Sequence, residues 1–342
     1  MLWERARDTW VGDCVRAGKK HGLELWIKAR ASSAGDVVRD CTNCMRELSA
    51  WCQIDGTTGP NVRDLTEAIS ALRLPAPGAD HGAEDSEAPI FLLSNGMRAG
   101  STLLQRILVT DRRVVLWGEP FGGMDLITKM VHSVAHPMNP WNLDSALTLD
   151  PNSPSLATSW IADFYPPSED FRLALRNFFD RWLGAPARRA GFVRWGFKEI
   201  RLSATEAMFL RWLYPGAKFI VLSRHPYDCY RSLADSGWVS PVVDDAYIDS
   251  AAAFARLWNR LVLSWAELPQ DFPAFHIKYE DLTAGNVDFR ELEGWLGIEI
   301  NESLALSAKV GSTAKRSRLS WYERLIISRV AASGMQALAY PA

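Results

Sequence analysis

The sequence lacks three features, each of which would indicate a definite class of protein. Its 342 residues carry 38 Lys and Arg against 40 Asp and Glu, so there is no surplus of positive charge to follow a nucleic-acid backbone. The longest apolar runs, such as Phe219–Leu222, reach four or five residues and are far too short to cross a bilayer. The five cysteines are odd in number and irregular in spacing, which is typical of reduced thiols and not of a disulfide framework. We therefore expect neither a nucleic-acid partner nor a membrane.

The first residues also lack the pattern of a targeting segment. Residues 1–8 include the acids Glu4 and Asp8 and no apolar stretch, which argues against a secretory signal or a transit peptide. The composition as a whole, 48% hydrophobic with a formal charge of −2, is typical of a soluble globular protein. We expect a cytoplasmic protein with one large core and a smaller appended unit, since single cores stop growing beyond about 250–300 residues.

A change of composition divides the chain into three parts. Residues 75–88 combine helix breakers, small residues and four acids with little to bury, which is typical of a linker. Before the linker, apolar residues recur at three- and four-residue steps in Val37–Cys52 and Val62–Leu72, which indicates helices. We therefore predict a helical amino-terminal segment of unknown role (1–74), a linker and a main domain (89–342).

Short β-rich runs alternate with helical patterns in the main domain. The expected strands are Pro89–Ser94, Val114–Trp117, Phe192–Lys198, Lys218–Ser223 and Ala274–Tyr279. The expected helices are Ser101–Leu108, Ala204–Leu213, Tyr227–Ser236, Tyr247–Leu268 and Asp288–Leu296. Near-continuous apolar strands separated by helices predict a parallel sheet covered on both faces, and hence an α/β domain. The stretch from Phe121 to Arg194, rich in Pro, Asn and Trp, is interpreted as an insertion that shapes a pocket.

The first expected strand leads into a glycine loop and then a helix, an order in which backbone N–H groups converge on one point and favour an anion. Gly96 and Gly100 allow close approach to the backbone. Ser101 and Thr102 add hydroxyl donors, and Arg98 supplies a positive charge. The alternative is an ordinary strand-to-helix turn. The Gly-Lys-Ser/Thr ending with which nucleotide triphosphatases hold phosphates and magnesium is missing, because Ser101 follows Gly100 directly.

Four motifs resemble those of sulfotransferases that use 3′-phosphoadenosine 5′-phosphosulfate (PAPS). The run Met97–Leu104 is similar to the family's 5′-phosphosulfate loop. Arg224, at the end of an expected strand, and Ser232, eight residues further on, resemble its 3′-phosphate motif. Tyr279, in a strand that ends Tyr-Glu-Asp, resembles the family's tyrosine beside the adenine. The basic run Ser312–Ser320 resembles the loop that closes over the cofactor.

The resemblance implies a P-loop-like fold and a binding site for PAPS. The cofactor-binding residues that it implies are Arg98, Ala99, Gly100, Ser101, Thr102, Leu103, Arg224, Ser232, Tyr279, Lys315 and Arg316. The chemistry of PAPS agrees, because its 3′-phosphate and its 5′-phosphosulfate need two separate anion sites, and an Arg suits a bidentate hold on a phosphate. The alternative for Arg224 is a surface ion pair with Asp228, four residues further on.

We predict Glu119, Lys198 and Arg98 as catalytic groups and no metal site, since sulfuryl transfer is an in-line displacement that depends on positioning and electrostatics. Glu119 follows the second expected strand, at the ligand-bearing edge of the sheet, and is the candidate general base. Lys198 ends the third strand and resembles the lysine that the family places against the leaving group. The alternatives are a glutamate that caps the turn before Pro120 and a surface lysine paired with Glu199.

His132 and His136 are alternative bases, because many members of the family use a histidine; an isolated surface histidine is the competing interpretation. Cys41 and Cys44 have the spacing of a zinc knuckle. Cys41 lies on an expected apolar helix face, however, which favours buried thiols.

These observations together favour a PAPS-dependent sulfotransferase that acts on a hydroxyl, or less readily an amine, of a small-molecule or carbohydrate acceptor and releases 3′,5′-phosphoadenosine. Two other functions stay open. A P-loop kinase for a small molecule is disfavoured by the missing loop lysine and by the lack of a clear strand-end Asp for magnesium. A non-catalytic nucleotide-binding module would leave Glu119 and Lys198 turned away from the loop. Neither the acceptor nor assembly into a homo-oligomer is fixed by the sequence.

Overall fold

The structure is a computed structural model, which describes residues 62–71, 87–120, 126–135, 168–236, 248, 250–301, 303 and 318–341. The chain divides into two compact units. The larger comprises residues 59–225 and 260–315, and the smaller comprises 1–58, 226–259 and 316–342. The helix expected at Val62–Leu72 is present as α3 (Val62–Ala71). The other helices predicted for 1–74, and nearly all of the linker at 75–88, lie outside the described residues.

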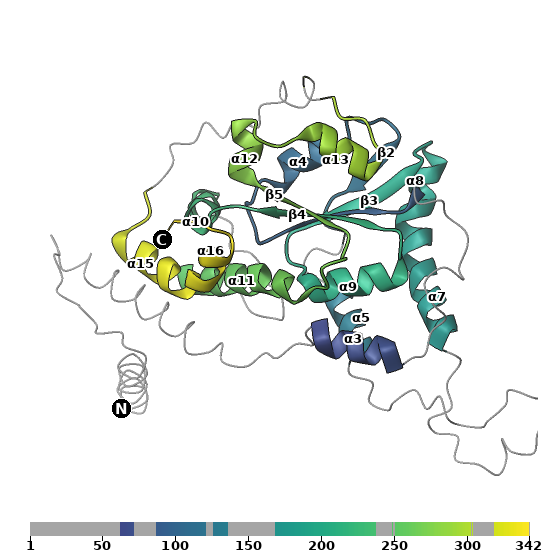
Figure 1. Ribbon diagram of the computed structural model, residues 1–342, viewed down its shortest axis with the longest axis horizontal. Helices are drawn as coiled ribbons and strands as arrows, with labels where there is room; N and C mark the ends of the chain where they lie inside the picture. Colours follow the sequence, from purple (N-terminus) through teal and green to yellow (C-terminus); the bar gives the residue numbers. More distant parts are fainter. Residues whose placement is uncertain are drawn as a thin grey trace, which may run out of the picture. The chain divides into compact units, whose positions relative to one another are not determined.

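The larger unit contains a five-stranded parallel sheet in the order β2-β3-β1-β4-β5 (Figure 1). Its strands are β1 (Ile90–Ser94), β2 (Val114–Trp117), β3 (Arg194–Glu199), β4 (Lys218–Ser223) and β5 (Ala274–Lys278). Every strand expected from the sequence is present to within two residues at its ends. The α/β class with a parallel sheet is therefore confirmed.

A row of aromatic rings crosses the middle of this sheet. Phe91 of the central strand lies in register with Phe197 of β3 and Phe219 of β4, with ring centroids 4.8 and 5.3 Å apart. All five residues of β1 are buried, which explains why the strand is a continuous apolar run. Gly196 is required opposite Ile90, because a Cβ there would lie 1.8 Å from the Ile90 carbonyl oxygen. Burial of each large side chain stabilises the sheet by about 1.5–3 kcal/mol.

Helices cover both faces of the sheet (Figure 1). Helices α4 (Ser101–Leu108), α12 (Tyr279–Ala284) and α13 (Phe289–Leu296) lie on one side, and α9 (Ala204–Leu213), α5 (Leu126–Ala135) and α3 lie on the other. Helix α9 begins in a capping box, in which Ser203 and Glu206 satisfy each other's backbone N–H groups. Its buried residues Phe209, Leu210 and Leu213 join the core cluster that includes Phe91.

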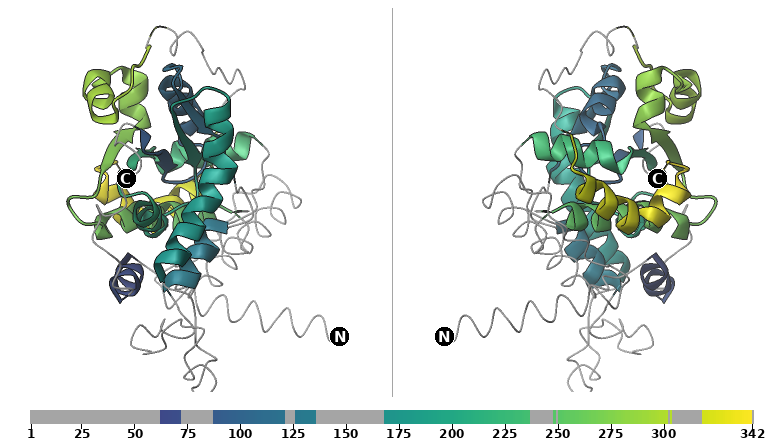
Figure 2. Two further views of the ribbon diagram at one scale, coloured as in Figure 1. Left: turned by 90° about the vertical axis from the view of Figure 1, so that its right-hand side faces the viewer. Right: turned by 90° about the vertical axis from the view of Figure 1, so that its left-hand side faces the viewer.

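The sequence predicts a pocket-shaping insertion between Phe121 and Arg194, and the part of that stretch which the structure describes is helical. That part forms α5, α7 (Ser168–Phe179), the π-helical turn η2 (Asp180–Gly184) and α8 (Ala185–Arg189). The last three follow one another as one helical column (Figure 2). Phe179 and Leu183 from this column are buried in the core under the sheet.

The amino-terminal edge of the sheet is fastened by a buried arginine. Arg194, the first residue of β3, is 3% exposed, and its guanidinium donates to the carbonyl oxygens of Ala88 and Leu296. Nearby, Asp111 accepts hydrogen bonds from the Arg113 side chain at 2.7 Å and from the Glu299 backbone N–H at 2.9 Å. These contacts join segments that lie far apart in the sequence.

The smaller unit contains α10 (Pro226–Asp235), α15 (Trp321–Val330), α16 (Ala332–Ala337) and the first part of α11 (Ala251–Ser264). The last residues of α11 and the 3₁₀ turn η3 (Trp265–Glu267) that follows it belong to the larger unit. The Tyr230 and Phe254 rings pack 5.5 Å apart, and the Gly334 N–H donates to the Asn259 side chain at 2.7 Å. Among the described residues, no helix is long and apolar enough to cross a membrane.

Candidate active site

All five strands end at the same edge of the sheet, and each is followed there by a polar or glycine-rich segment. Loop 95–100 follows β1, Glu119 follows β2, Lys198 and Arg201 lie at the end of β3, Arg224 follows β4, and Tyr279 follows β5. Because the strands are parallel, one edge collects all of these groups. This is the edge at which open α/β sheets bind their ligands.

The loop after β1 has the backbone of an anion site. Three of its residues have left-handed φ angles: Gly96 (109°), Arg98 (61°) and Gly100 (94°). Gly100 is the N-cap of α4 and forms no side-chain cap, so the first-turn N–H groups of α4 are not covered by a capping side chain. The Asn95 N–H donates to the Leu222 carbonyl oxygen at 2.9 Å, which ties the loop to β4. This backbone suits a phosphate or sulfate group.

Tyr279 and Arg224 fix the loop from the β4 and β5 side. A Cβ on Gly100 would lie 2.2 Å from Cδ2 of Tyr279, so the tyrosine ring packs directly on the glycine. The Arg224 guanidinium carbon lies 4.2 Å from the centroid of that ring, and its Nη1 donates to the Arg98 carbonyl oxygen at 2.9 Å. This cation–π contact holds a positive charge beside the loop. Arg224, which is predicted to bind a second anionic group, therefore contacts the loop that is predicted to bind the first.

An ionic cluster lies at the other side of the same edge, on β2 and β3. Lys198 Nζ donates to Glu119 Oε1 at 2.5 Å, and Arg201 Nη2 lies 3.3 Å from Glu119 Oε2. Arg201 also binds Glu199, at 3.0 Å from Oε1. The side chains of Lys198, Arg201 and Glu199 are no more than 10% exposed, whereas that of Glu119 is 27% exposed. Within the cluster, Glu119 is therefore the group that a substrate can reach most easily.

Burial governs the charge state of the deepest member of the cluster. Burial raises the pKa of Glu199 above its ordinary value, and the nearby Arg201 guanidinium and the Ile200 N–H oppose that rise. The carboxylate of Glu119 also contributes a small rise through like-charge repulsion. Arg201 is accordingly placed to neutralise two carboxylates at once.

Helix α4 links the loop to the strand that carries Glu119. Gln105 Nε2 donates to the carbonyl oxygens of Leu116 at 2.8 Å and Trp117 at 3.2 Å. These are the last two residues of β2, three and two positions before Glu119. Helix α4, which follows the loop, is therefore joined to the end of β2 by one side chain.

One alternative interpretation is wrong. Lys198 is not a surface lysine paired with Glu199, because it is buried and bound to Glu119. Asp228, the alternative partner of Arg224, pairs with Arg231 at 2.5 Å. The Glu119 carboxylate contacts both Lys198 and Arg201.

The remaining predicted residues fall into two groups. Ala99 and Ser101 are buried in the loop and the first turn of α4, Leu103 is half-buried, and Thr102 is exposed. Ser232 lies half-buried on α10 in the smaller unit, and His132 lies on α5. His136, Lys315, Arg316 and the cysteines Cys41 and Cys44 lie outside the described residues.

Sequence reasoning missed Arg201, Glu199 and Gln105. Glu199 and Arg201 stand one and three residues past Lys198, so their position at a strand end was a usable signal. No local pattern shows that Arg201 reaches a carboxylate 82 positions earlier in the chain. Gln105 gives no signal either, because a glutamine on a helix is ordinarily solvent-exposed.

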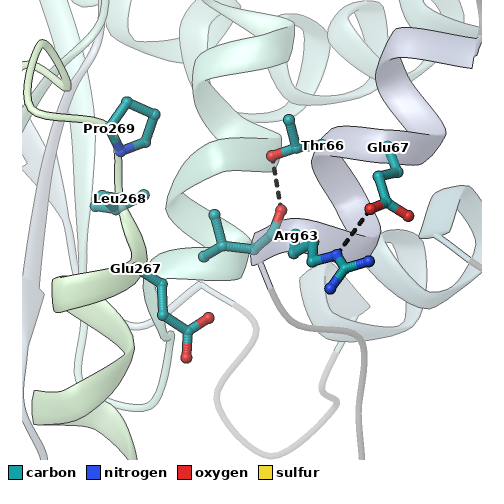
Figure 3. Close-up of a pocket in the computed structure, with 7 residues that line it drawn as sticks. Arg63, Thr66, Glu67, Glu267, Leu268 and Pro269 are labelled. Atoms are coloured by element: carbon teal, nitrogen blue, oxygen red, sulfur yellow. Dashed lines mark hydrogen bonds and ion pairs between the residues drawn. The ribbon is translucent and has the colours of Figure 1, made fainter.

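A separate pocket of about 670 Å³ lies between α3 and η3 (Figure 3). Among its lining residues the only cation is Arg63, which pairs with Glu67 at 2.8 Å, and Glu267 adds a further acid. This lining does not suit an anionic nucleotide. The edge with the glycine loop is therefore the better candidate for a nucleotide site.

A model of the Sulfotransferase family matches residues 89–302, which is more than half of the chain. No curated protein is similar enough to this chain to count as a match.

Among solved structures, the sulfotransferase domain of the Synechococcus PCC 7002 olefin synthase is 18% identical, with 77% of this chain and 99% of that domain covered and a TM-score of 0.42. Sulfotransferase STF9 of Mycobacterium avium is 15% identical, with 92% and 88% covered and a TM-score of 0.42. Mouse sulfotransferase SULT7A1, complexed with PAP, is 13% identical, with 82% and 91% covered and a TM-score of 0.36.

Proposed function

The chain belongs to the sulfotransferase family, and from this premise we propose that its donor is PAPS and its acceptor a hydroxyl, or else an amine, of a small molecule or carbohydrate. The product on the donor side is then 3′,5′-phosphoadenosine. The observation that carries the proposal is the contact between Glu119 and Lys198 at the sheet edge that also holds the glycine loop. It joins a carboxylate that can accept a proton to a cation that can neutralise a leaving group.

The described residues fit a donor with two separated anionic groups. The left-handed loop and the uncapped start of α4 suit the 5′-phosphosulfate, and Arg98 adds a positive charge there. Arg224 supplies a guanidinium for the 3′-phosphate, and Tyr279 offers an aromatic face beside it. Ser232, Lys315 and Arg316 remain assigned to the donor on the strength of the motifs alone.

The chemistry requires one proton transfer and one displacement at sulfur. Bound PAPS supplies an activated sulfuryl group. Glu119 accepts the proton of the acceptor hydroxyl while the acceptor oxygen forms its bond to sulfur. The bond from sulfur to the 5′-phosphate oxygen breaks, and that oxygen keeps the electron pair. Lys198 neutralises the negative charge that develops on the leaving oxygen. This electrostatic stabilisation is strongest in a site that holds little water.

The geometry favours this division of roles over a base at His132. Glu119 follows β2, which Gln105 ties to the loop helix, so the base and the loop are held in a fixed relation. His132 lies on α5, within the layer of helices on the α9 side of the sheet. Glu119 therefore remains the proposed base.

A transfer assay tests the proposal. The protein is incubated with PAPS and panels of phenols, alcohols, amines and sugars in the presence of a chelator, and products are read by the mass gain of one SO₃ unit. We expect transfer to at least one class of acceptor without added metal. Phosphoryl transfer from ATP that stops when a chelator is added would instead show a P-loop kinase.

A further inference from the structure

The two carboxylate oxygens of Glu119 are held by two different cations. Lys198 Nζ binds Oε1 at 2.5 Å, and Arg201 Nη2 binds Oε2 at 3.3 Å. A base must keep its carboxylate in a fixed orientation to take a proton from a positioned hydroxyl, because small misplacements lower rates strongly. The two cations are therefore candidates for that positioning.

Arg201 is itself anchored, and the anchor does not involve the substrate. Its Nη2 lies 3.0 Å from Oε1 and 3.2 Å from Oε2 of Glu199. Glu199 Oε1 in turn accepts the Ile200 backbone N–H at 2.8 Å. A chain of contacts thus runs from the backbone after β3 through Glu199 and Arg201 to Glu119. Both anchoring side chains are no more than 10% exposed.

Lys198 differs from Arg201 because the proposed reaction gives it a second task. As negative charge grows on the leaving oxygen, the Lys198 ammonium is attracted to that oxygen and its hold on Glu119 weakens. Arg201 Nη2 stays between its two carboxylates, since its partner Glu199 is buried and unchanged by the reaction. We propose that Arg201 is a positioning residue, which keeps Glu119 oriented through Oε2 while Lys198 serves the donor. This inference rests on the proposed function, in which Glu119 is the base.

The variants Arg201→Met, Lys198→Met and Glu119→Gln separate the two roles. Arg201→Met should lower kcat by roughly 10- to 100-fold, because the base loses its fixed orientation. It should leave the affinity for 3′,5′-phosphoadenosine, measured by calorimetry, unchanged. Lys198→Met should lower kcat and also weaken that binding, because Lys198 contacts the donor. Arg211→Met is the matched control. Arg211 lies on α9 and pairs with Asp271 at 3.5 Å, so its substitution should change neither kcat nor the affinity for 3′,5′-phosphoadenosine.

A double-mutant cycle then tests whether Arg201 acts through Glu119. In the Glu119→Gln background, Arg201→Met should cause little further loss of kcat, because a group that positions the base has nothing left to position. Fully additive losses, with donor binding intact, would overturn the inference while the proposed function stands. Loss of 3′,5′-phosphoadenosine binding in Arg201→Met would also overturn it, by showing that Arg201 contacts the donor.

A second variant keeps the test valid if Arg201→Met does not fold. Removal of Arg201 alone leaves the buried Glu199 without its neutralising guanidinium, which is costly. The pair Glu199→Gln and Arg201→Met removes both charges and retains an acceptor for the Ile200 N–H. It should show the same loss of kcat with the same donor affinity. If wild-type protein fails to bind 3′,5′-phosphoadenosine at all, the proposed function fails, and this inference fails with it.

Discussion

Arg194 begins strand β3 and Arg201 follows its end, and both guanidinium groups are largely buried, yet they bind different partners. At the amino-terminal edge, Arg194 donates to two backbone carbonyl oxygens. At the carboxyl-terminal edge, Arg201 contacts two carboxylates, one of which is partly exposed. The first arrangement satisfies backbone groups and fastens segments together. The second concentrates charged side chains at the sheet edge where open α/β sheets bind ligands.

The difference shows that residue type alone does not identify a site in this protein. The two arginines lie at opposite ends of β3, and the edge that each occupies decides its role. In a parallel sheet, the carboxyl-terminal edge gathers the ends of all strands together with a helix N-terminus, so charge placed there can meet an anion. The comparison makes opposite predictions for the two edges: substitutions at one should change stability, and at the other, binding or chemistry.

The largest effect should follow Glu119→Gln. This change keeps the shape of the side chain but removes its ability to accept a proton, so kcat should fall by roughly 10²–10⁴-fold with donor affinity nearly unchanged. Single-turnover rates at saturating PAPS measure this. A loss of tenfold or less would move the base assignment to His132 or His136.

Arg194→Met should destabilise the amino-terminal edge of the sheet. The substitution leaves the carbonyl oxygens of Ala88 and Leu296 buried without their donor, at a cost of about 1–3 kcal/mol each. Chemical denaturation should show this loss of unfolding free energy. The protein that remains folded should bind 3′,5′-phosphoadenosine as wild type does; a selective loss of binding would show that the two edges are not separate in function.

Arg224→Ala should weaken donor binding by about 1.5–3 kcal/mol, through loss of a charged hydrogen-bond donor to the 3′-phosphate. Discrimination between 3′,5′-phosphoadenosine and adenosine 5′-phosphate should decrease in parallel, as titration calorimetry can show. If the variant keeps the wild-type preference, Arg224 is not the 3′-phosphate ligand.

Acid should weaken the amino-terminal edge through Asp111. Its hydrogen bond from the Arg113 guanidinium lowers the pKa of Asp111 to about 2. A lowered folded-state pKa adds stability that is fully present above the unfolded value near 3.9 and is lost as the pH falls towards about 2. Wild type should therefore exceed Asp111→Asn in unfolding free energy by about 2 kcal/mol at neutral pH. The gap should close between about pH 4 and pH 2; a gap independent of pH would refute the ionic origin.

Gly100→Ala should cost about 1–2 kcal/mol of unfolding free energy from its left-handed φ alone. It should also weaken donor binding, because the new Cβ displaces the Tyr279 ring from the loop. Gly285→Ala is the matched control: its φ is also positive, at 75°, but a Cβ there meets nothing within 4 Å. Equal donor affinity in the two variants would show that the contact with Tyr279 does not matter for binding.

Much of the fold could be predicted because buried parallel strands appear as short continuous apolar runs, as β1 and β4 do. The positions of Glu119 and Lys198 at the sheet edge followed from the same runs. Helices α5 and α7 were missed because the Pro, Asn and Trp content of the whole stretch between Phe121 and Arg194 favoured an insertion, although neither helix contains Pro or Trp. The contact of Arg201 with Glu119 could not be predicted, since it joins segments 82 positions apart that meet only in the folded sheet. The contact of Gln105 with β2 depends on how α4 packs on that strand, which the sequence does not show.

The central claim, that the carboxyl-terminal edge binds a donor with two anionic groups, is tested most directly by thermal unfolding of the wild-type protein with 3′,5′-phosphoadenosine in a chelator. At 100 times its dissociation constant the ligand should stabilise the protein by about 2.7 kcal/mol. For a chain of 342 residues this corresponds to a rise of roughly 4 °C in Tm. Adenosine 5′-phosphate at the same concentration should give a smaller rise. Stabilisation by ATP with magnesium alone, and none by 3′,5′-phosphoadenosine, would contradict the account.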